Sequence, residues 1–516
     1  MKRWVDKLLK AVLVVSMMWP DTNHYFAQGV VSSAPWVGTW SVAPSVTDDD
    51  GFNNQTVRQI VHTSIGGTSA RIHLSNLYGT EPLVIGNVHI ARRARGKNTI
   101  AGSDLAVTFG GQPNVTIPVG ASIVSDSIAF QVPALADVAI SLYLPQRTPP
   151  HSTGHVDGLQ DVYIAPGDAG ADPAFAGGTA NSAGGQSYYF LTNLDVQNAA
   201  ATGAVVAFGA SITDGLLSRA NTNRRWPNRL AVRLQKAGMT VGVLNQGISG
   251  NDFFTDNAGQ AGLTRFDRDV LQQPGVKWVI VSDDAVNDLN NDNPSTAPQL
   301  IAAFRQLIDR SHRANIKLIC STLTPFDAPP AVQAVRQRVN AFILSPTSGC
   351  DAVLDQASAV SDPTDPAIFL PAYNGGDDLH PNDAGLQAIA DAVDLDALSS
   401  LPPIQPPSTC GQLGPGQGLA SGQKLTSCAG RFALNVQADG DLTITQTTTT
   451  IWSAGMSGSS TAELRMQENG NLVAFDFNGA VLWESGTSGN PGAYAYMQDD
   501  GTLVIYALSG AIWSSR

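Results

Sequence analysis

The sequence predicts a multidomain chain: a β-sandwich at the N-terminus, a central α/β domain with a parallel sheet, and a β-rich repeat region at the C-terminus. Three patterns predict this order. Apolar residues alternate with period two before residue 200, apolar runs alternate with helix-like stretches from 201 to 401, and a repeat of 30 or 31 residues follows residue 410. The length of 516 residues suffices for about three domains.

Composition limits the classes of partner. The chain has 30 basic and 43 acidic residues, a formal net charge of −13 and an isoelectric point near 4.9. This charge argues against nucleic acid or an anionic membrane surface as a partner. Hydrophobic residues make up 43% of the chain, enough to fill several cores.

Residues 1–27 have the pattern of a signal peptide. Four basic residues among the first ten precede the apolar run 11–19, which is too short to span a bilayer. We expect cleavage near Ala27. No other stretch predicts a transmembrane segment, so we expect a secreted, extracellular protein.

Short alternating strands fill residues 36–197. The runs 70–77 and 138–144 alternate apolar and polar residues, and Gly, Pro, Asn and Asp separate such runs. This spacing is typical of a β-sandwich. His151 and His155 lie four residues apart in a Gly-rich segment that is not helical, so we expect structural rather than catalytic or metal-binding roles for them.

Residues 201–401 alternate strand candidates with helix candidates, which predicts a parallel, doubly wound sheet. Pro227 suits the first turn of a helix that Gly238 can end, and 300–312 forms a second amphipathic helix. We expect Asp383 to cap the last helix. The strand candidates are 204–208, 240–244, 277–281, 316–321 and 352–355.

Residues suited to nucleophilic catalysis follow the carboxyl ends of these strands. Ser211 comes after an apolar strand and a tight glycine turn, at the edge where open α/β sheets bind ligands. A serine hydroxyl needs a base, which His380 can be, and Asp377 can hold the imidazole. The backbone N–H groups of Ser211 and Gly250 and the side-chain amide of Asn287 can form an oxyanion hole. The pattern predicts a Ser211–His380–Asp377 triad.

These blocks resemble those of the SGNH hydrolases, the GDSL-like esterase superfamily. The residues that give the family its name match Ser211, Gly250, Asn287 and His380, and Asp377 matches the Asp-x-x-His pair. The resemblance implies a flavodoxin-like sheet of order 2-1-3-4-5 and ester hydrolysis without a metal or other cofactor.

Longer phrases at 225–227, 265–270 and 379–383 resemble one branch of secreted bacterial members. Members of that branch carry a β-rich N-terminal region, including a segment like 36–40. The resemblance implies removal of acyl groups from plant polysaccharides such as xylan.

Two positions depart from the family pattern. Ala210 replaces the Asp of the usual Gly-Asp-Ser, and Ala285 replaces the Gly of the usual Gly-x-Asn-Asp. The family's Asp helps to brace the loops around the nucleophile. If its Gly uses a conformation that alanine disfavours, Ala285 adds strain of about 1 kcal/mol and shifts Asn287. We therefore expect weakened activity.

The four cysteines lack zinc-ligand spacing. In an oxidising compartment the local pair Cys410 and Cys428 should form a disulfide. Cys320 and Cys350 form either a second disulfide or two buried free thiols.

A stiff, proline-rich linker at 402–409 leads to the repeat region 410–516. The segments 437–441, 467–471 and 498–502 each hold a turn signal flanked by alternating apolar residues, so each copy should form a small β-sheet. We expect the tryptophan that recurs in each copy to belong to a shared core.

The repeats resemble the bulb-type mannose-binding lectins, whose fold is a β-prism and whose sugar motif is Gln-x-Asp-x-Asn-x-Val-x-Tyr. The resemblance implies mannose-type sugar binding, against the simpler interpretation that the motifs are turns. The third copy keeps four motif residues and the second keeps three: Gln498, Asp500, Val504, Tyr506, Gln467, Asn471 and Val473.

The sequence favours a secreted serine esterase that removes acetyl or similar groups from a polysaccharide or a small ester, targeted by a lectin. One alternative is a lipid or aryl esterase, although no apolar lid is evident. The other is a sugar-binding protein whose hydrolase domain is weakened or inactive, which Ala210 and Ala285 favour and the intact triad opposes.

Overall fold

The computed structural model describes residues 34–47, 49–181, 186–399, 401 and 405–516. The expected signal peptide and residues 402–404 of the expected linker lie outside the described residues. Residues 35–516 form one compact unit. In the described part of the chain, no helix combines the length and the apolarity that crossing a membrane requires.

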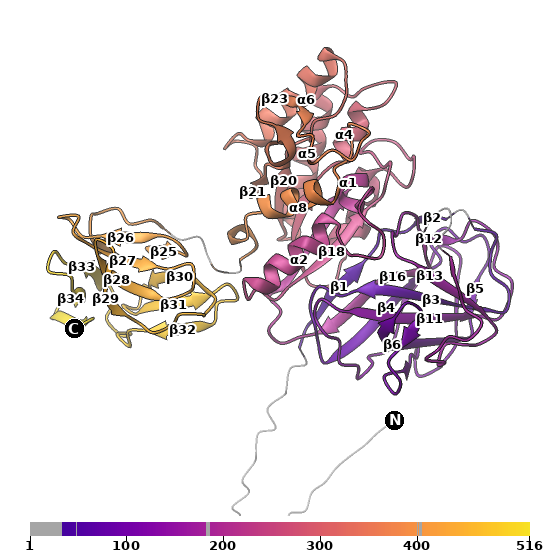
Figure 1. Ribbon diagram of the computed structural model, residues 1–516, viewed down its shortest axis with the longest axis horizontal. Coiled ribbons are helices and arrows are strands. Elements are labelled where there is room, and N and C mark those ends of the chain that lie inside the picture. The colour runs from indigo at the N-terminus through magenta and orange to yellow at the C-terminus, as the bar shows by residue number, and fades with distance from the viewer. Residues whose placement is uncertain (1–33, 48, 182–185, 400, 402–404) are drawn as a thin grey trace, which may run out of the picture. The chain divides into compact units, whose positions relative to one another are not determined.

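The N-terminal region consists of β-sheets, as the alternating pattern predicts (Figure 1). A four-stranded and a seven-stranded sheet contribute apolar side chains to one core, for example Ile72 from the first sheet and Ile140 from the second. The four-stranded sheet has the order β1 (Trp36–Ser41), β16 (Leu191–Gln197), β4 (Ser69–Ser75) and β10 (Ser122–Val124).

The larger sheet runs in the order β14 (Thr179–Asn181), β13 (Val162–Pro166), β3 (Gln55–His62), β11 (Asp137–Leu144), β6 (Asn87–Arg95) and β7 (Asn98–Thr99), with β8 (Leu105–Ala106) also paired to β6. The short strands beside these sheets are β2 (Ser45–Val46), β5 (Leu83–Ile85), β9 (Val115–Ile117), β12 (Thr153–His155) and β15 (Tyr188–Tyr189).

The central sheet has five parallel strands. Numbered along the chain, their order is 2-1-3-4-5, as the family resemblance implies. All five strand candidates are confirmed, with small differences in their bounds. The order in space is β18 (Val241–Gly247), β17 (Gly203–Gly209), β19 (Val276–Val281), β20 (Lys317–Ser321) and β21 (Ala352–Leu354).

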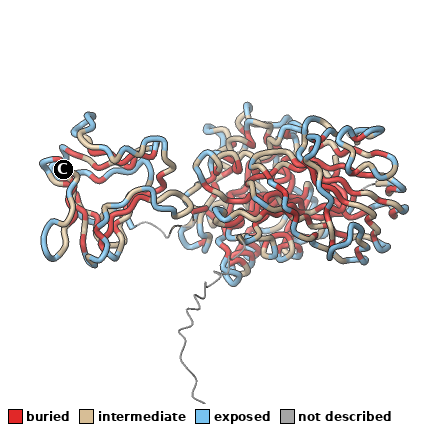
Figure 2. Tube along the Cα trace, turned by 90° about the horizontal axis from the view of Figure 1, so that it is seen from below, coloured by how far each residue is buried: buried red, intermediate tan, exposed pale blue. Residues whose placement is uncertain are grey.

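Helices cover both faces of this sheet (Figure 1), which explains why β17 is buried along its whole length. Buried residues, red in Figure 2, gather in the interior, and exposed residues, pale blue, lie on the outer loops. Val206 and Phe208 share a core with α5 and α6 on one face, and Val205 and Ala207 pack with α2 and α8 on the other. The bounds are α2 (Trp226–Lys236), α5 (Ala297–Arg313), α6 (Pro330–Ile343) and α8 (Asp383–Ala392).

The expected cap of the last helix was wrong by one residue. Asn382 caps α8, since its side-chain oxygen accepts hydrogen bonds from the backbone N–H groups of Ala384 and Gly385 at 2.9 and 3.1 Å. Asp383 instead accepts a hydrogen bond from the guanidinium of Arg224 at 2.9 Å. Asn and Asp cap helices equally well, so the sequence could not choose between them.

Shorter elements connect the strands: α1 (Ser211–Asp214), α3 (Gly262–Phe266), η1 (Asp267–Leu271), α4 (Asp284–Leu289), α7 (Gln356–Val360), β22 (Ser361–Asp362), β23 (Asp365–Phe369) and η2 (Asp396–Leu398).

The edge strand β18 is covered by the N-terminal region. Ser64 accepts a hydrogen bond from the Val243 backbone N–H at 2.9 Å, and the Ser41 hydroxyl donates to the Asn245 carbonyl at 3.2 Å. Side chains thereby satisfy backbone groups that a sheet edge otherwise leaves open.

The repeat region forms three four-stranded antiparallel sheets around one core. Each copy supplies three strands and a short strand from 412–426 completes each sheet. The sheets are β24 (Gln412–Leu413), β33 (Tyr494–Met497), β34 (Leu503–Ala507) and β35 (Gly510–Ser514); β25 (Gly418–Ala420), β30 (Thr461–Met466), β31 (Leu472–Asp476) and β32 (Val481–Glu484); and β26 (Lys424–Thr426), β27 (Phe432–Val436), β28 (Leu442–Gln446) and β29 (Thr449–Ser453).

The recurring tryptophans belong to this core, as expected. Trp452, Trp483 and Trp513 pack edge to face with one another, with ring centroids 5.7 to 6.5 Å apart. One tryptophan from each copy therefore joins the three sheets.

Both cysteine pairs are disulfides. Cys410 bonds to Cys428 as expected, and Cys320 bonds to Cys350, which decides between the two alternatives for that pair. Cys320 lies on β20, and Cys350 lies just before the neighbouring strand β21. This disulfide therefore ties β20 to the segment that leads into β21.

Candidate active site

Three side chains above the carboxyl edge of the central sheet form a hydrogen-bonded series. Ser211, the first residue of α1, lies two residues after the end of β17, and its Oγ lies 2.8 Å from Nε2 of His380. Nδ1 of His380 lies 2.7 Å from Oδ2 of Asp377, whose other oxygen accepts the His380 backbone N–H at 2.9 Å. The arrangement has the connectivity of a nucleophile, a base and an orienting carboxylate.

The Asp377 carboxylate is held in its ionised form. Burial alone would raise its pKa, but hydrogen bonds from the His380 ring and from the backbone N–H groups of His380 and Leu379 lower the pKa below its usual value. An ionised carboxylate beside Nδ1 stabilises the imidazolium that forms when His380 accepts a proton.

The residues expected to form the oxyanion hole lie on two adjoining loops. Gly250 follows β18 with φ +80°, a conformation that favours glycine. Asn287 lies on α4, and its Nδ2 donates to the Asn251 carbonyl at 2.7 Å. An amide has two N–H groups, so one stays available after this contact. The structure thus brings Asn287 to the loop of Gly250.

Asp283 braces the turn that carries Ser211, a role that the sequence analysis missed. Its carboxylate accepts the backbone N–H groups of Ala210 at 3.0 Å and Ile212 at 2.7 Å, and the Thr213 hydroxyl at 2.5 Å. Burial raises the pKa of Asp283, and these hydrogen bonds oppose the rise. A carboxylate from the end of β19 therefore sits beside Ala210, where the family usually has its own Asp. The only sequence signal was an acidic residue two positions after a buried strand.

Ala285 introduces no left-handed backbone conformation. It lies buried in α4, and its φ is not positive. Alanine is the most favourable residue in a helix. The expected strain at this position is therefore wrong.

Arg265 joins the loops of the site through hydrogen bonds. Its buried guanidinium donates to the carbonyls of Gly209 and Gln246 at 2.9 and 2.8 Å and to Oδ1 of Asn251 at 2.8 Å. It also contacts the carboxylates of Asp269 and Asp284 at 3.3 and 3.4 Å.

Two buried carboxyl groups of α4 have raised pKa values. Burial raises the pKa of Asp284 to about 7, although Arg265 opposes the rise. Burial also raises the pKa of Asp288 to about 8, and the nearby carboxylates Asp252 and Asp284 add to the rise. Oδ2 of Asp288 accepts the Phe253 backbone N–H at 2.9 Å, and this hydrogen bond limits the rise of the Asp288 pKa.

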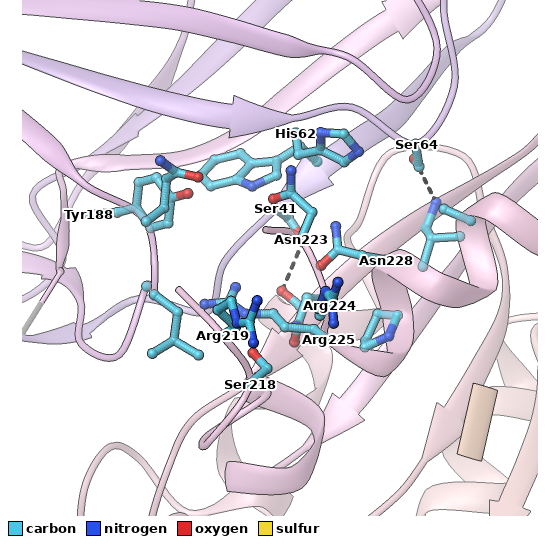
Figure 3. Close-up of a pocket in the computed structure, with 18 residues that line it drawn as sticks. Ser41, His62, Ser64, Tyr188, Ser218, Arg219, Asn223, Arg224, Arg225 and Asn228 are labelled. Carbon is cyan, nitrogen blue, oxygen red and sulfur yellow. Dashed lines mark hydrogen bonds between the residues drawn. The ribbon is translucent and has the colours of Figure 1, made fainter. Parts of the chain in front are cut away.

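A separate polar pocket lies where the N-terminal region meets the central domain (Figure 3). Its lining includes His62 and Tyr188 from the β-sheets and Arg219, Arg224 and Arg225 from the segment before and at α2. None of the three residues of the Ser–His–Asp series lines it, so the pocket is distinct from that site.

In the described part of the chain, no group of three or more His, Cys, Asp or Glu side chains is arranged to hold a metal ion.

The sugar-motif segments of the repeat region form three equivalent turns. Gly440, Gly470 and Gly501 have φ values of +90°, +89° and +88°. In each copy the glycine N–H donates to the carbonyl of the motif glutamine, at 2.9, 3.0 and 3.1 Å. Each segment therefore serves at least as a turn.

The motif residues of the third copy keep polar groups near the surface. Nε2 of Gln498 donates to the Tyr506 hydroxyl at 2.7 Å, and Asp500 is exposed. Val504 is buried. The structure thus gathers Gln498 and Tyr506, with Asp500 in the adjoining turn.

The second copy differs in its asparagine. Gln467 is half-buried and Val473 is buried. Asn471 is 4% exposed, and its side chain contacts Glu484, Ser485 and the Thr487 backbone at 2.8, 3.0 and 3.0 Å. Its polar atoms are engaged within the protein, so the contacts favour a structural role for Asn471.

The fold is an α/β domain with a Ser–His–Asp series at the carboxyl edge of its parallel sheet. Residues 207–388 match the GDSL-like Lipase/Acylhydrolase family, and this segment runs from β17 into α8. The chain thus contains a GDSL-like acylhydrolase domain, which implies an ester hydrolase. No curated protein matches the chain.

Solved structures resemble separate parts of the chain. A protein assigned to the G-D-S-L lipolytic family from Desulfitobacterium hafniense is 22% identical over 37% of this chain and 97% of its own, with a TM-score of 0.30. A mannose-binding lectin from Gastrodia elata is 30% identical over 20% and 94%, with a TM-score of 0.19. A lectin from Mycobacterium smegmatis is 33% identical over 20% and 97%, with a TM-score of 0.13.

The position of Asp283 predicts the effect of two variants on ester turnover. Ala210→Asp should not raise kcat, because the carboxylate that the loop needs is already present and a second would be buried beside it. Asp283→Asn replaces one acceptor oxygen by a donor facing the Ile212 N–H, so kcat should fall about 10-fold or more. Steady-state kinetics on p-nitrophenyl acetate measure both. A rise in kcat for Ala210→Asp would contradict the bracing role of Asp283.

The raised pKa of Asp288 predicts a pH-dependent stability. Folding favours its protonated form, so the wild type loses stability as pH rises from about 4 to about 8, by at most about 1.4 kcal/mol per pH unit from this group. Asp288→Asn does not titrate, so its Tm relative to wild type should increase from pH 5 to pH 8.5. The Tm of Asp292→Asn, an exposed control with the same charge change, should vary with pH as that of the wild type does. If the Tm of Asp288→Asn varied with pH in parallel with that of the wild type, the raised pKa of Asp288 would be wrong.

Proposed function

We propose that this protein is a secreted serine esterase that removes acetyl or other short acyl groups from an acylated polysaccharide. The observation that carries the proposal is the series from Ser211 Oγ through His380 to Asp377, at 2.8 and 2.7 Å. The family match of residues 207–388 supports ester chemistry in general. The xylan-type substrate rests on the resemblance of the longer sequence phrases.

The geometry suits a two-step reaction. His380 Nε2 takes the proton of Ser211 as Oγ attacks the ester carbonyl, and the ionised Asp377 stabilises the imidazolium. The N–H groups of Ser211 and Gly250 and the free amide hydrogen of Asn287 stabilise the oxyanion. His380 then protonates the leaving alcohol, and the same base activates the water that releases the acyl group.

Two further observations support export and sugar targeting. The two disulfides suit an oxidising compartment. In the C-terminal region, Gln498 and Tyr506 present polar groups near the surface, where a mannose-type sugar would bind. Binding to a polymer would raise the local concentration of acyl groups around the catalytic domain.

The nucleophile is tested by Ser211→Ala. We expect kcat for p-nitrophenyl acetate to fall about 10⁴-fold or more, because no other hydroxyl can form the acyl-enzyme. Ser218→Ala, a buried serine outside the triad, is the control and should keep wild-type turnover. Wild-type turnover in Ser211→Ala would exclude the mechanism. A panel of p-nitrophenyl esters from acetate to palmitate, with acetylated xylan, separates the polysaccharide proposal from a lipid esterase.

Sugar targeting is tested by Gln498→Ala in the full chain. Binding to a mannan column should weaken, while turnover of p-nitrophenyl acetate stays unchanged. Gln437→Ala is the matched control, since Gln437 occupies the same turn in the copy that lost most of the motif. Equal retention of both variants and wild type, or no retention of any, would argue against the sugar site.

A further inference from the structure

A buried polar contact joins the N-terminal β region to the nucleophile turn. Nε2 of His155, on β12, lies 3.0 Å from Oδ1 of Asp214, the last residue of α1. Their side chains are 2% and 1% exposed. Asp214 follows the nucleophile Ser211 by three residues.

Both ring nitrogens of His155 have a hydrogen-bond partner. Nδ1 lies 2.9 Å from the Ala43 carbonyl, which can only accept, so Nδ1 carries a hydrogen. Nε2 faces a carboxylate whose other oxygen accepts both the backbone N–H and the hydroxyl of Ser249, at 3.1 and 3.0 Å. His155 and Asp214 therefore form a buried, hydrogen-bonded pair in which both ring nitrogens and both carboxylate oxygens have a partner.

The same carboxylate reaches the oxyanion loop. Ser249 directly precedes Gly250, whose N–H is assigned to the oxyanion. Within the nucleophile turn, the Asp214 N–H donates to the Ala210 carbonyl at 2.8 Å. Asp214 therefore links the turn that carries the nucleophile to the loop that carries an oxyanion donor, and His155 fixes the Asp214 side chain.

We propose that His155 is a positioning residue of the active site, through which the N-terminal β region sets the geometry of the nucleophile turn and the oxyanion loop. The proposal rests on the proposed esterase function. It assigns a role to the N-terminal region beyond covering a sheet edge, because this contact reaches residues adjacent to both catalytic loops. Losing the pair should misplace the oxyanion donor relative to Ser211, which affects the transition state more than substrate binding.

Two substitutions of His155 separate its contacts. His155→Gln retains an amide N–H at the position of Nε2, facing Asp214, whereas His155→Asn retains one near Nδ1, facing the Ala43 carbonyl. We expect His155→Asn to lower kcat for p-nitrophenyl acetate about 10- to 100-fold with little change in KM. His155→Gln should restore most of the loss.

A matched control measures the general cost of removing an imidazole–carboxylate pair. His73, in the same β region, contacts Asp195 through Nε2 at 2.7 Å. His73→Asn should lower Tm without lowering kcat of the folded protein. Equal kcat for wild type and His155→Asn, or equal losses for the Asn and Gln variants of His155, would overturn the proposal.

A second variant tests the proposal even if His155→Asn fails to fold. Ser249→Ala removes one of the two contacts on Oδ2 of Asp214 and should lower kcat several-fold at constant KM. Combined with His155→Gln, its effect should differ from the product of the single effects, since both act through Asp214. Wild-type kcat for Ser249→Ala, or strictly multiplicative effects, would contradict the proposed link.

Ser211→Ala is assayed on the same substrate. If it retains activity, the proposed esterase function fails whatever His155 does. If it is inactive while His155→Asn keeps wild-type kcat, only the positioning role fails.

Discussion

The active-site loops depend on the buried guanidinium of Arg265. A guanidinium has five N–H donors, and five acceptors surround this one: two carbonyls, one side-chain amide oxygen and two carboxylates. Its plane also lies over the Phe208 ring, 4.1 Å from the centroid. The carbonyls of Gly209 and Gln246 belong to β17 and β18, the strands that lead to Ser211 and to the loop of Gly250. One guanidinium thus fixes the separation of these two loops while all five of its donors have acceptors.

The sequence predicted the central domain well because a parallel strand buried on both faces is visible as a continuous apolar run. Once β17 was located, Ser211 followed from its position at the strand end. Asp377 and His380 share one loop, so their contact required no knowledge of long-range packing. Similarly, the shared tryptophan core of the repeats followed from their regular spacing.

Contacts between distant segments could not be predicted. Asp283 bonds to the backbone of Ala210 across 73 residues, and His155 contacts Asp214 across 59. Each is an ordinary polar residue in its local sequence. Only the fold shows that the carboxylate of Asp283 lies beside the position where the family pattern has its Asp and this chain has Ala210.

The covered edge of β18 limits how this protein can be divided. The change of sequence pattern near residue 200 suggests a place to separate the hydrolase domain, yet Ser64 and Ser41 bond to backbone groups of β18 from the other side of that position. A fragment starting there would expose an unpaired strand, which favours edge-to-edge association with other chains. For protein engineering, the transferable module is therefore the β region together with the α/β domain.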